Sequence, residues 1–417
     1  MTAAPAPPAA MRLGLIQLAS RQVVPNLLMA LPLLRAGCLQ RHVVLHTDDP
    51  AESWRPASQL VNVLAGLNGA DRVDWVVQGV EPDAGHVYAT ACAAMDELGE
   101  SLRWILHVTG GTKTMAWGLM QLARHPRVAV VLYRDLGAAC WRQLRLTADG
   151  APEDLPLAPR DATTQELARI LAREDCGLDS LSLPQLLLSQ LALTDTLVHV
   201  DTTHAPRPPR VRGRDAVADV DVAGWLRSAL HRQRGFALAA PRRAALPPRT
   251  EEGTAFECWV AHLLVALGAR QAQWNVCVDD ATGGPLIEFD AVACRGDRLL
   301  AMDLKLVAHD SGAKSAELRV AHQTAQWVGG RSAQTAVIRP NWRSSAPVRS
   351  VARQLGVHLV TRENLAQLPH LVQAWLGVTP CAQQKALAQT LSELLNQAAQ
   401  GAAANASVMR HGCLQAA

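Results

Sequence analysis

The sequence lacks several features that assign a protein to a class at first sight. No uninterrupted apolar stretch reaches the roughly 20 residues that a membrane-spanning helix requires, although 49% of the residues are hydrophobic. The first ten residues, MTAAPAPPAA, have neither the basic segment nor the continuous apolar core of a signal peptide. We therefore expect a cytoplasmic protein with no membrane contact, whose opening residues form a flexible arm.

Cysteine frameworks and strong charge are missing as well. The nine cysteines lie far apart, with no C-x-x-C pair and no Cys/His cluster at metal-ligand spacing, so we expect reduced, mostly buried thiols. A net charge of +3 is too small to identify a partner. Between Arg207 and Arg249 arginines are dense and acids few, and we interpret this stretch as a solvated linker rather than a phosphate-binding surface.

The length of 417 residues favours two or three domains. From Arg12 to Leu146, short apolar runs alternate with amphipathic segments, which is typical of strands joined by crossover helices. The expected strands are Leu13–Leu18, His42–His46, Arg72–Val77, Leu102–Val108, Val128–Tyr133 and Cys140–Leu146. Helices are expected to begin near Pro25, Trp54, Ala84 and Lys113. Parallel pairing then gives a doubly wound, Rossmann-like α/β sheet with helices on both faces.

The remainder of the chain divides into three parts. Residues 150–250 predict a connecting helical region, with helices at Thr163–Ala172 and Pro184–Leu193. Residues 251–380 predict a second α/β domain, with helices over Thr254–Leu267 and Leu318–Val328 and strands at Ile287–Cys294, Leu299–Leu306, Thr335–Ile338 and His358–Val360. Residues 381–417 are rich in Ala and Gln and predict a helical and flexible tail. The first domain accordingly spans residues 11–149.

Two loops of the first domain fall at the carboxyl ends of strands, where doubly wound sheets bind ligands. The loop after the first strand offers hydrogen-bonding groups on Ser20 and Asn26. The loop after the fourth strand reads HVTGGTKTM; it combines two glycines that permit close backbone approach, hydroxyl groups and a cation at a helix start, where free N–H groups favour anions. These residues are Thr109, Gly110, Gly111, Thr112, Lys113 and Thr114. Equally, the motif suits a tight turn with a capping threonine and a solvated lysine.

The TGGTK motif matches neither the Walker loop nor the dinucleotide fingerprint. Together with SRQVVPNLL it resembles the signature of the CARF domain, the CRISPR-associated Rossmann-fold sensor, over roughly residues 12–146. This resemblance implies that Ser20, Asn26 and the loop from Thr109 to Lys113 bind a cyclic oligoadenylate, such as the tetra- or hexaadenylate, across the axis of a homodimer.

A second set of candidate residues lies in the segment IEFDAVACRGDRLLAMDLK. As a hairpin turning at Arg-Gly-Asp, it places Asp290 on one strand and Asp303 with Lys305 on the next, and the alternation of side chains puts Asp303 and Lys305 on one face. Acids and a lysine in an apolar strand are costly unless paired or coordinating a metal, although an edge strand with a surface ion pair also fits. Upstream, Glu257 lies among apolar residues of a helix.

The ordered set of Glu257, Asp290 and Asp-x-Lys resembles the PD-(D/E)xK pattern of restriction-endonuclease-like enzymes, with Phe-Asp in place of Pro-Asp. With the sensor, it is similar to the CARF-linked nucleases of type III CRISPR defence. The resemblance implies that Glu257, Asp290 and Asp303 bind Mg²⁺ or Mn²⁺, that Lys305 assists catalysis, and that DNA, RNA or both are cleaved after messenger binding. Aspartate at position 303 differs from the glutamate often found there and leaves the metal preference open.

Three alternatives remain open from the sequence. Arg353 and His358 match the R-x4-6-H spacing of metal-independent HEPN ribonucleases, but this histidine falls in a β-like run, GVHLV, whereas HEPN requires a helix. In the second alternative, the chain is a messenger-responsive regulator or messenger sink without nuclease activity. Finally, the sensor itself is a candidate for degrading its messenger.

Overall fold

The computed structural model describes residues 11–49, 53–67, 69–97, 102–135, 140–173, 177–190, 210–231, 252–279, 285–306, 315–330 and 333–415. The chain forms two compact units. The amino-terminal unit comprises residues 1–181 and 185–196, and the carboxy-terminal unit comprises residues 182–184 and 197–417. Each is described by itself.

The amino-terminal unit contains a seven-stranded sheet in the order β3-β2-β1-β4-β5-β6-β7. Strands β1 to β5 pair in parallel, whereas β6 and β7 are antiparallel to their neighbours. The strands are β1 Leu13–Leu18, β2 Leu39–His46, β3 Asp74–Gly79, β4 Arg103–His107, β5 Val128–Asp135, β6 Cys140–Leu146 and β7 Pro152–Pro156. The predicted doubly wound, Rossmann-like sheet is confirmed for β1 to β5. The last predicted strand, β6, runs antiparallel because only a short connection joins it to β5.

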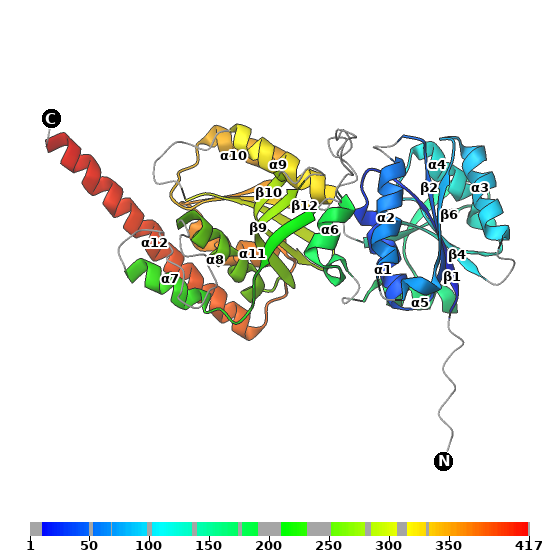
Figure 1. Ribbon diagram of the computed structural model, residues 1–417, viewed down its shortest axis with the longest axis horizontal. Helices are drawn as coiled ribbons and strands as arrows, with labels where there is room; N and C mark the ends of the chain where they lie inside the picture. The colour runs from blue at the N-terminus through cyan, green and yellow to red at the C-terminus, as the bar shows by residue number, and fades with distance from the viewer. Residues whose placement is uncertain are drawn as a thin grey trace, which may run out of the picture. The chain divides into compact units, whose positions relative to one another are not determined.

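Helices cover both faces of this sheet, with α1 and α2 on one face and α3 and α4 on the other (Figure 1). Their bounds are α1 Val24–Arg35, α2 Arg55–Ala65, α3 Ala84–Asp96, α4 Lys113–Met120 and α5 Ala162–Leu171. Alternating residues of the central strands, such as Ile16 and Leu106, pack with α3 and α4 in one apolar core. This two-sided burial explains why the central strands are nearly continuous apolar runs.

The region between residues 150 and 250 is less uniformly helical than its sequence predicts. It contains α5, α6 (Leu183–Gln190) and α7 (Val222–His231), but also β7 in the first sheet and β8 (Arg210–Asp215) in the second. Both strands lie at sheet edges and are mostly exposed, so neither shows the apolar alternation that identifies a strand. Of the arginine-rich stretch Arg207–Arg249, residues 207–209 and 232–249 lie outside the described residues.

The carboxy-terminal unit is built on a six-stranded mixed sheet in the order β13-β12-β11-β10-β9-β8. Strands β8 to β11 pair antiparallel, and β11, β12 and β13 pair in parallel. The additional strands are β9 Gln271–Asp279, β10 Pro285–Arg295, β11 Arg298–Leu304, β12 Ala333–Arg339 and β13 Val357–Thr361. The predicted hairpin between β10 and β11 is present and turns at Gly296–Asp297.

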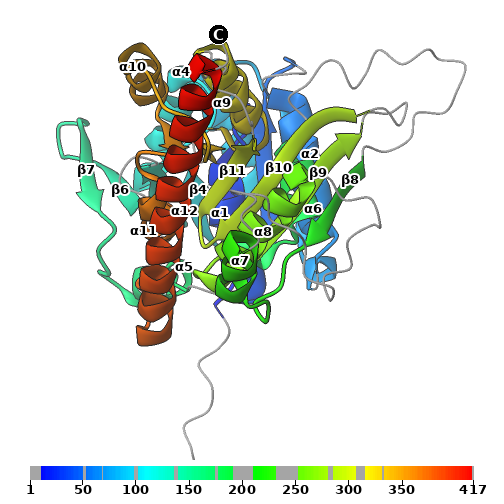
Figure 2. The same cartoon turned by 90° about the vertical axis from the view of Figure 1, so that its left-hand side faces the viewer.

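Helices also cover both faces of the second sheet. They are α8 Glu252–Ala266, α9 Ser315–Gly329, α10 Ala346–Leu355, α11 Leu368–Trp375 and α12 Ala382–Gln415. Figure 2 shows α7, α8 and α12 over one face, where their apolar residues form a core with the strands. A smaller core joins α9 and α10 to the opposite face. Of the helices within the described residues, none has the combination of length and apolarity needed to cross a bilayer.

Candidate functional site

The loop after β4 carries the glycine pair and is shaped by it. A side chain at Gly110 would place its Cβ 2.1 Å from the Leu18 carbonyl oxygen, so this backbone packs directly against the end of β1. Gly111 has a φ of 71°, a conformation that other residues rarely adopt. The two glycines therefore fix a tight turn at the carboxyl ends of the two central strands.

Two threonines of this loop, Thr109 and Thr112, are hydrogen-bonded within the protein. Thr109 Oγ1 accepts from the Arg134 backbone N–H (2.7 Å) and lies 2.6 Å from His107 Nε2. Thr112 caps α4 by accepting from the Met115 backbone N–H at 3.2 Å. Lys113 is the first residue of α4 and is exposed. At the helix start the exposed polar side chains are therefore those of Thr112, Lys113 and Thr114, whereas the Thr109 hydroxyl is bound within the protein.

The two polar residues after β1 have different surroundings. Asn26 is buried in α1, where its amide donates to the Leu18 carbonyl at 3.0 Å. The partly exposed Ser20 hydroxyl accepts from the Gln22 backbone N–H at 3.3 Å. Asn26 therefore ties α1 to the end of β1, and Ser20 has the more accessible side chain.

A feature that the sequence did not reveal is a pair of buried histidines on either side of β1. His42 on β2 is paired with Leu15, and His107 on β4 is paired with Gln17, on the face opposite to the core around Ile16. The pKa of each imidazole is lowered to about 3, by burial in His42 and by burial together with the proximity of His42 in His107. Both residues are therefore neutral at physiological pH.

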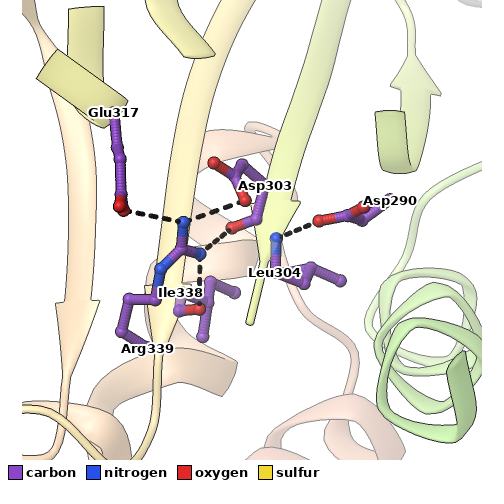
Figure 3. Close-up of polar contacts among 6 residues, drawn as sticks. All are labelled: Asp290, Asp303, Leu304, Glu317, Ile338 and Arg339. Carbon is purple, nitrogen blue, oxygen red and sulfur yellow. Dashed lines mark hydrogen bonds and ion pairs between the residues drawn. The ribbon is translucent and has the colours of Figure 1, made fainter. Parts of the chain in front are cut away.

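In the carboxy-terminal unit, two of the predicted acids lie on adjacent strands. The pairing of Ala291 with Met302 is the last between β10 and β11, so Asp290 and Asp303 follow it directly on the two strands. Asp290 Oδ2 accepts a short hydrogen bond from the Leu304 backbone N–H, and Asp303 Oδ1 accepts from Arg339 Nη2 at 2.9 Å (Figure 3). Each carboxylate is thus held through one oxygen, and no described residue forms a hydrogen bond with the other oxygen.

Asp290, Asp303 and Lys305 line one pocket of about 200 Å³. Glu288 adds a third acid to its wall, and the helix side is formed by residues of α9, including Val320 and Thr324. Lys305 is exposed, whereas both aspartates are partly buried. The sequence motif therefore assembles two carboxylates and one ammonium group around a single hollow.

Glu257, on α8, does not line this pocket but is electrostatically linked to it. Burial, with smaller contributions from the charges of Asp290 and Glu288, raises the pKa of Glu257 to about 8. Burial also raises the pKa of Asp290 to about 6; the hydrogen bond from Leu304 opposes this shift, and the Asp303 charge adds to it. Both carboxyl groups therefore hold their protons at higher pH than free acids do, mainly because they are buried.

The carboxylates of this site are suitable donors for a divalent cation. Oxygen donors are what Mg²⁺ and Mn²⁺ prefer, and the raised pKa values of Glu257 and Asp290 are those of carboxyl groups that an additional cation would stabilise. Within the ranges that the structure describes, however, no three His, Cys, Asp or Glu side chains converge closely enough to hold a metal by themselves. The donor set fits a cation bound by two carboxylates with water, as Mg²⁺ commonly is.

The raised pKa of Glu257 predicts that ionisation of this carboxyl group lowers the free energy of unfolding. A folded-state pKa above the unfolded value contributes stability at low pH, which is lost as the pH rises towards 8. We expect Glu257→Gln to increase the free energy of unfolding at pH 8 by about 1–3 kcal/mol, after a discount for partial exposure. Urea unfolding at pH 8 and pH 5 would measure this gain, which should shrink at pH 5.

Glu393→Gln provides the matched control, because Glu393 is exposed on α12 and, among the described residues, its side chain bonds to Gln389 alone. It should alter the free energy of unfolding little at either pH. A loss of stability in Glu257→Gln at pH 8 would contradict the prediction, since it would mean that the ionised carboxylate is favourably paired.

Several residues near this site belong to none of the sequence motifs described above. Arg339, at the end of β12, contacts Asp303 and lies 3.7 Å from Glu317 on α9. Asn275 on β9 has a φ of 50°, a strained value for a residue with a side chain, and its neighbours Trp274 and Val276 pair with Ala291 and Phe289 on either side of Asp290. Only the strand register brings these residues to the site.

The geometry does not favour the metal-independent ribonuclease. Arg353 is on α10 and exposed, whereas His358 is on β13, as the β-like run predicts. The His358 ring stacks on Trp375 at 4.7 Å, and burial lowers its pKa. The pair does not lie on one helix, as HEPN chemistry requires.

Comparisons with known proteins place the fold. No protein-family model matches the sequence, and no curated protein matches it. Among solved structures, the chain is similar to Can2 from Sulfobacillus thermosulfidooxidans in complex with cyclic tetra-adenylate (TM-score 0.55, 15% identity, 88% of this chain and 99% of that one). It is also similar to protein VC1899 from Vibrio cholerae (TM-score 0.57, 11% identity, 87% of this chain and 98% of that one). The two-unit α/β fold is therefore shared with these proteins over nearly their whole length.

Proposed function

We propose that this chain is a metal-dependent nuclease activated by a cyclic oligoadenylate, with a CARF sensor as its amino-terminal unit and a PD-(D/E)xK effector as its carboxy-terminal unit. The proposal assigns it to type III CRISPR antiviral defence, as a cytoplasmic homodimer that cleaves DNA, RNA or both. The similarity of fold to a protein solved with cyclic tetra-adenylate supports the sensor assignment.

One observation carries the nuclease assignment: Asp290, Asp303 and Lys305 line a single pocket. Two neighbouring carboxylates and an ammonium group on the central strands of the sheet serve phosphodiester hydrolysis, in which a nucleophile approaches an anion and charge builds on the phosphorus oxygens. An ion pair of Lys305 with one of the two aspartates explains this arrangement less well. Asp303 pairs with Arg339 instead, and no described residue forms an ion pair with Asp290.

The pocket residues, and Glu257 outside the pocket wall, have distinct proposed roles. Asp290 and Asp303 would hold Mg²⁺ or Mn²⁺, which when bound supplies positive charge that offsets the charge developing on the phosphate. Glu257, with its pKa near neutrality, would accept a proton from the attacking water or orient it. The exposed ammonium group of Lys305 would steady the phosphate oxygens at the pocket mouth.

The sensor proposal rests on the turn after β4. Gly110 and Gly111 lack side chains, which lets the backbone of this turn pack closely against Leu18. Lys113 is exposed at the start of α4, where helix N–H groups and a cation attract phosphate. Ligand binding would shift a population between two arrangements of the dimer, one of which favours cleavage. Ser20 and the backbone around Thr112 would complete the contacts.

Cleavage of labelled single-stranded and duplex DNA and RNA tests the function. With Mn²⁺ and either cyclic tetra- or hexaadenylate we expect cleavage of at least one substrate, and EDTA should abolish it. Lys113→Ala should raise the messenger concentration for half-maximal cleavage about tenfold, the equivalent of one lost charged contact of about 1.4 kcal/mol.

Two results would count against the proposal. Equal cleavage with and without messenger would contradict the sensor assignment. Absence of cleavage under all conditions, together with tight messenger binding, would favour a messenger-responsive regulator or messenger sink. Arg72→Ala is a suitable control for Lys113→Ala, because Arg72 is an exposed cation of the same unit outside this loop.

A further inference from the structure

Arg339 is an unusual residue for the interior of a protein. It lies at the end of β12, with 1% of its surface exposed, and is among the largest fully buried side chains of the described residues. Burying a guanidinium costs several kcal/mol unless charge and hydrogen bonds compensate. The contacts that stabilise Arg339 therefore indicate its role.

Those contacts concentrate on one residue of the pocket. Nη1 donates to the Asp303 carbonyl oxygen at 3.0 Å and to the Ile338 carbonyl oxygen at 3.1 Å. Nη2 donates to Asp303 Oδ1 at 2.9 Å and lies 3.7 Å from Glu317 Oε2. The two nitrogens thus bind the main chain and the side chain of Asp303 at once, as Figure 3 shows.

This double contact restricts Asp303 in a specific way. With its carbonyl and Oδ1 bound to one planar group, the carboxylate has little freedom to rotate about its side-chain bonds. No described residue donates a hydrogen bond to Asp303 Oδ2, and the residue lines the pocket with Asp290. The fixed orientation therefore presents the second oxygen for a ligand.

We propose that Arg339 is the positioning residue of the cation site, and that its guanidinium, braced by Glu317, orients Asp303 for binding the divalent cation. The inference rests on the proposed nuclease function. Partners that orient first ligands in this way commonly change metal affinity by 10- to 100-fold when they are replaced. Glu317, partly exposed in the first turn of α9, contacts the guanidinium from the side opposite to Asp303 (Figure 3).

Mn²⁺ binding to the full chain, measured by titration calorimetry without nucleic acid, tests the role independently of cleavage. Arg339→Lys preserves the charge but removes the planar fork, so it separates orientation from electrostatics. We expect it to weaken Mn²⁺ binding about tenfold or more. The matched control is Arg343→Lys, the same change at an exposed arginine four residues further on, which should leave Mn²⁺ affinity unchanged.

Glu317→Gln is the second variant, since a partly exposed side chain is replaced by one of the same shape. It should weaken Mn²⁺ binding about two- to fivefold, less than Arg339→Lys, because Arg339 keeps its bonds to Asp303. Thermal unfolding of each metal-free variant would show whether the fold is intact.

The outcomes separate the two proposals. Wild-type affinity, or tighter binding, in a folded Arg339→Lys protein would overturn the positioning role while leaving the nuclease proposal in place. If Arg339→Lys does not fold, unchanged Mn²⁺ affinity in Glu317→Gln would overturn it. Absence of saturable Mn²⁺ binding by the wild-type chain would overturn both.

Discussion

Replacing Asp303 with asparagine is expected to reduce the messenger-activated cleavage rate by about 1,000-fold, which corresponds to about 4 kcal/mol of lost transition-state stabilisation. Asparagine has nearly the same shape, and its amide oxygen can still accept from Arg339 Nη2, so the fold should survive. What it loses is the negative charge that, in the proposed function, holds the cation beside Asp290. Single-turnover rates at saturating messenger and Mn²⁺ would measure the change.

Asp297→Asn is the control for this substitution. Asp297 lies in the turn of the same β10–β11 hairpin but does not line the pocket, so its replacement should leave the rate nearly unchanged. Comparable rates for Asp303→Asn and the wild type would contradict the nuclease proposal. A similar loss in both variants would point to a disturbed hairpin instead of a lost ligand.

The sequence was informative where chemistry and periodicity coincide. The D-x-K motif and the Arg-Gly-Asp turn predict the β10–β11 hairpin, and Asp290, Asp303 and Lys305 do line one pocket. Alternation along a strand is a local property, so the side on which Asp303 and Lys305 point follows from the sequence alone. Glu257 was placed on its helix correctly, but its separation from the pocket depends on how α8 packs.

Long-range pairing explains what the sequence did not reveal. Arg339 is 36 residues from Asp303, and the parallel register of β11 with β12 brings them together. A single arginine at the end of an apolar strand belongs to no motif. Strand β9 was missed although its buried residues Ala272, Trp274, Val276 and Val278 alternate with polar ones, which is the pattern that indicates a strand.

The TGGTK loop shows a different limit. The sequence located the loop at the end of β4 and the glycines in its turn, but it left a ligand site and a capped turn as equal alternatives. Thr112 does cap α4, and Lys113 is exposed, so the structural use of the threonine is compatible with phosphate binding by the lysine. Residue types define what a loop can bind, and hydrogen bonding decides which of them remain available.

The buried histidines predict strong acid sensitivity of the amino-terminal unit. Because the folded-state pKa of His42 and of His107 is lowered to about 3, both stay neutral in the folded chain while the unfolded chain takes up protons below pH 6.5. Stability is therefore full above the unfolded pKa and falls as the pH decreases towards 3. At pH 5 the loss should be about 2 kcal/mol for each histidine, or about 4 kcal/mol for the pair.

Urea unfolding of the full chain at pH 7 and pH 5 would measure this loss. His42→Leu should remove about half of it, since leucine has a similar volume and cannot be protonated; both ring nitrogens of His42 lack hydrogen-bond partners among the described residues, so no bond is lost. His86→Leu, at an exposed histidine of the same unit, should leave the pH dependence unchanged. An unaltered pH dependence in His42→Leu would show that the imidazole reaches water or a counter-charge when it is protonated. The prediction that burial keeps His42 neutral in the folded unit would then be wrong.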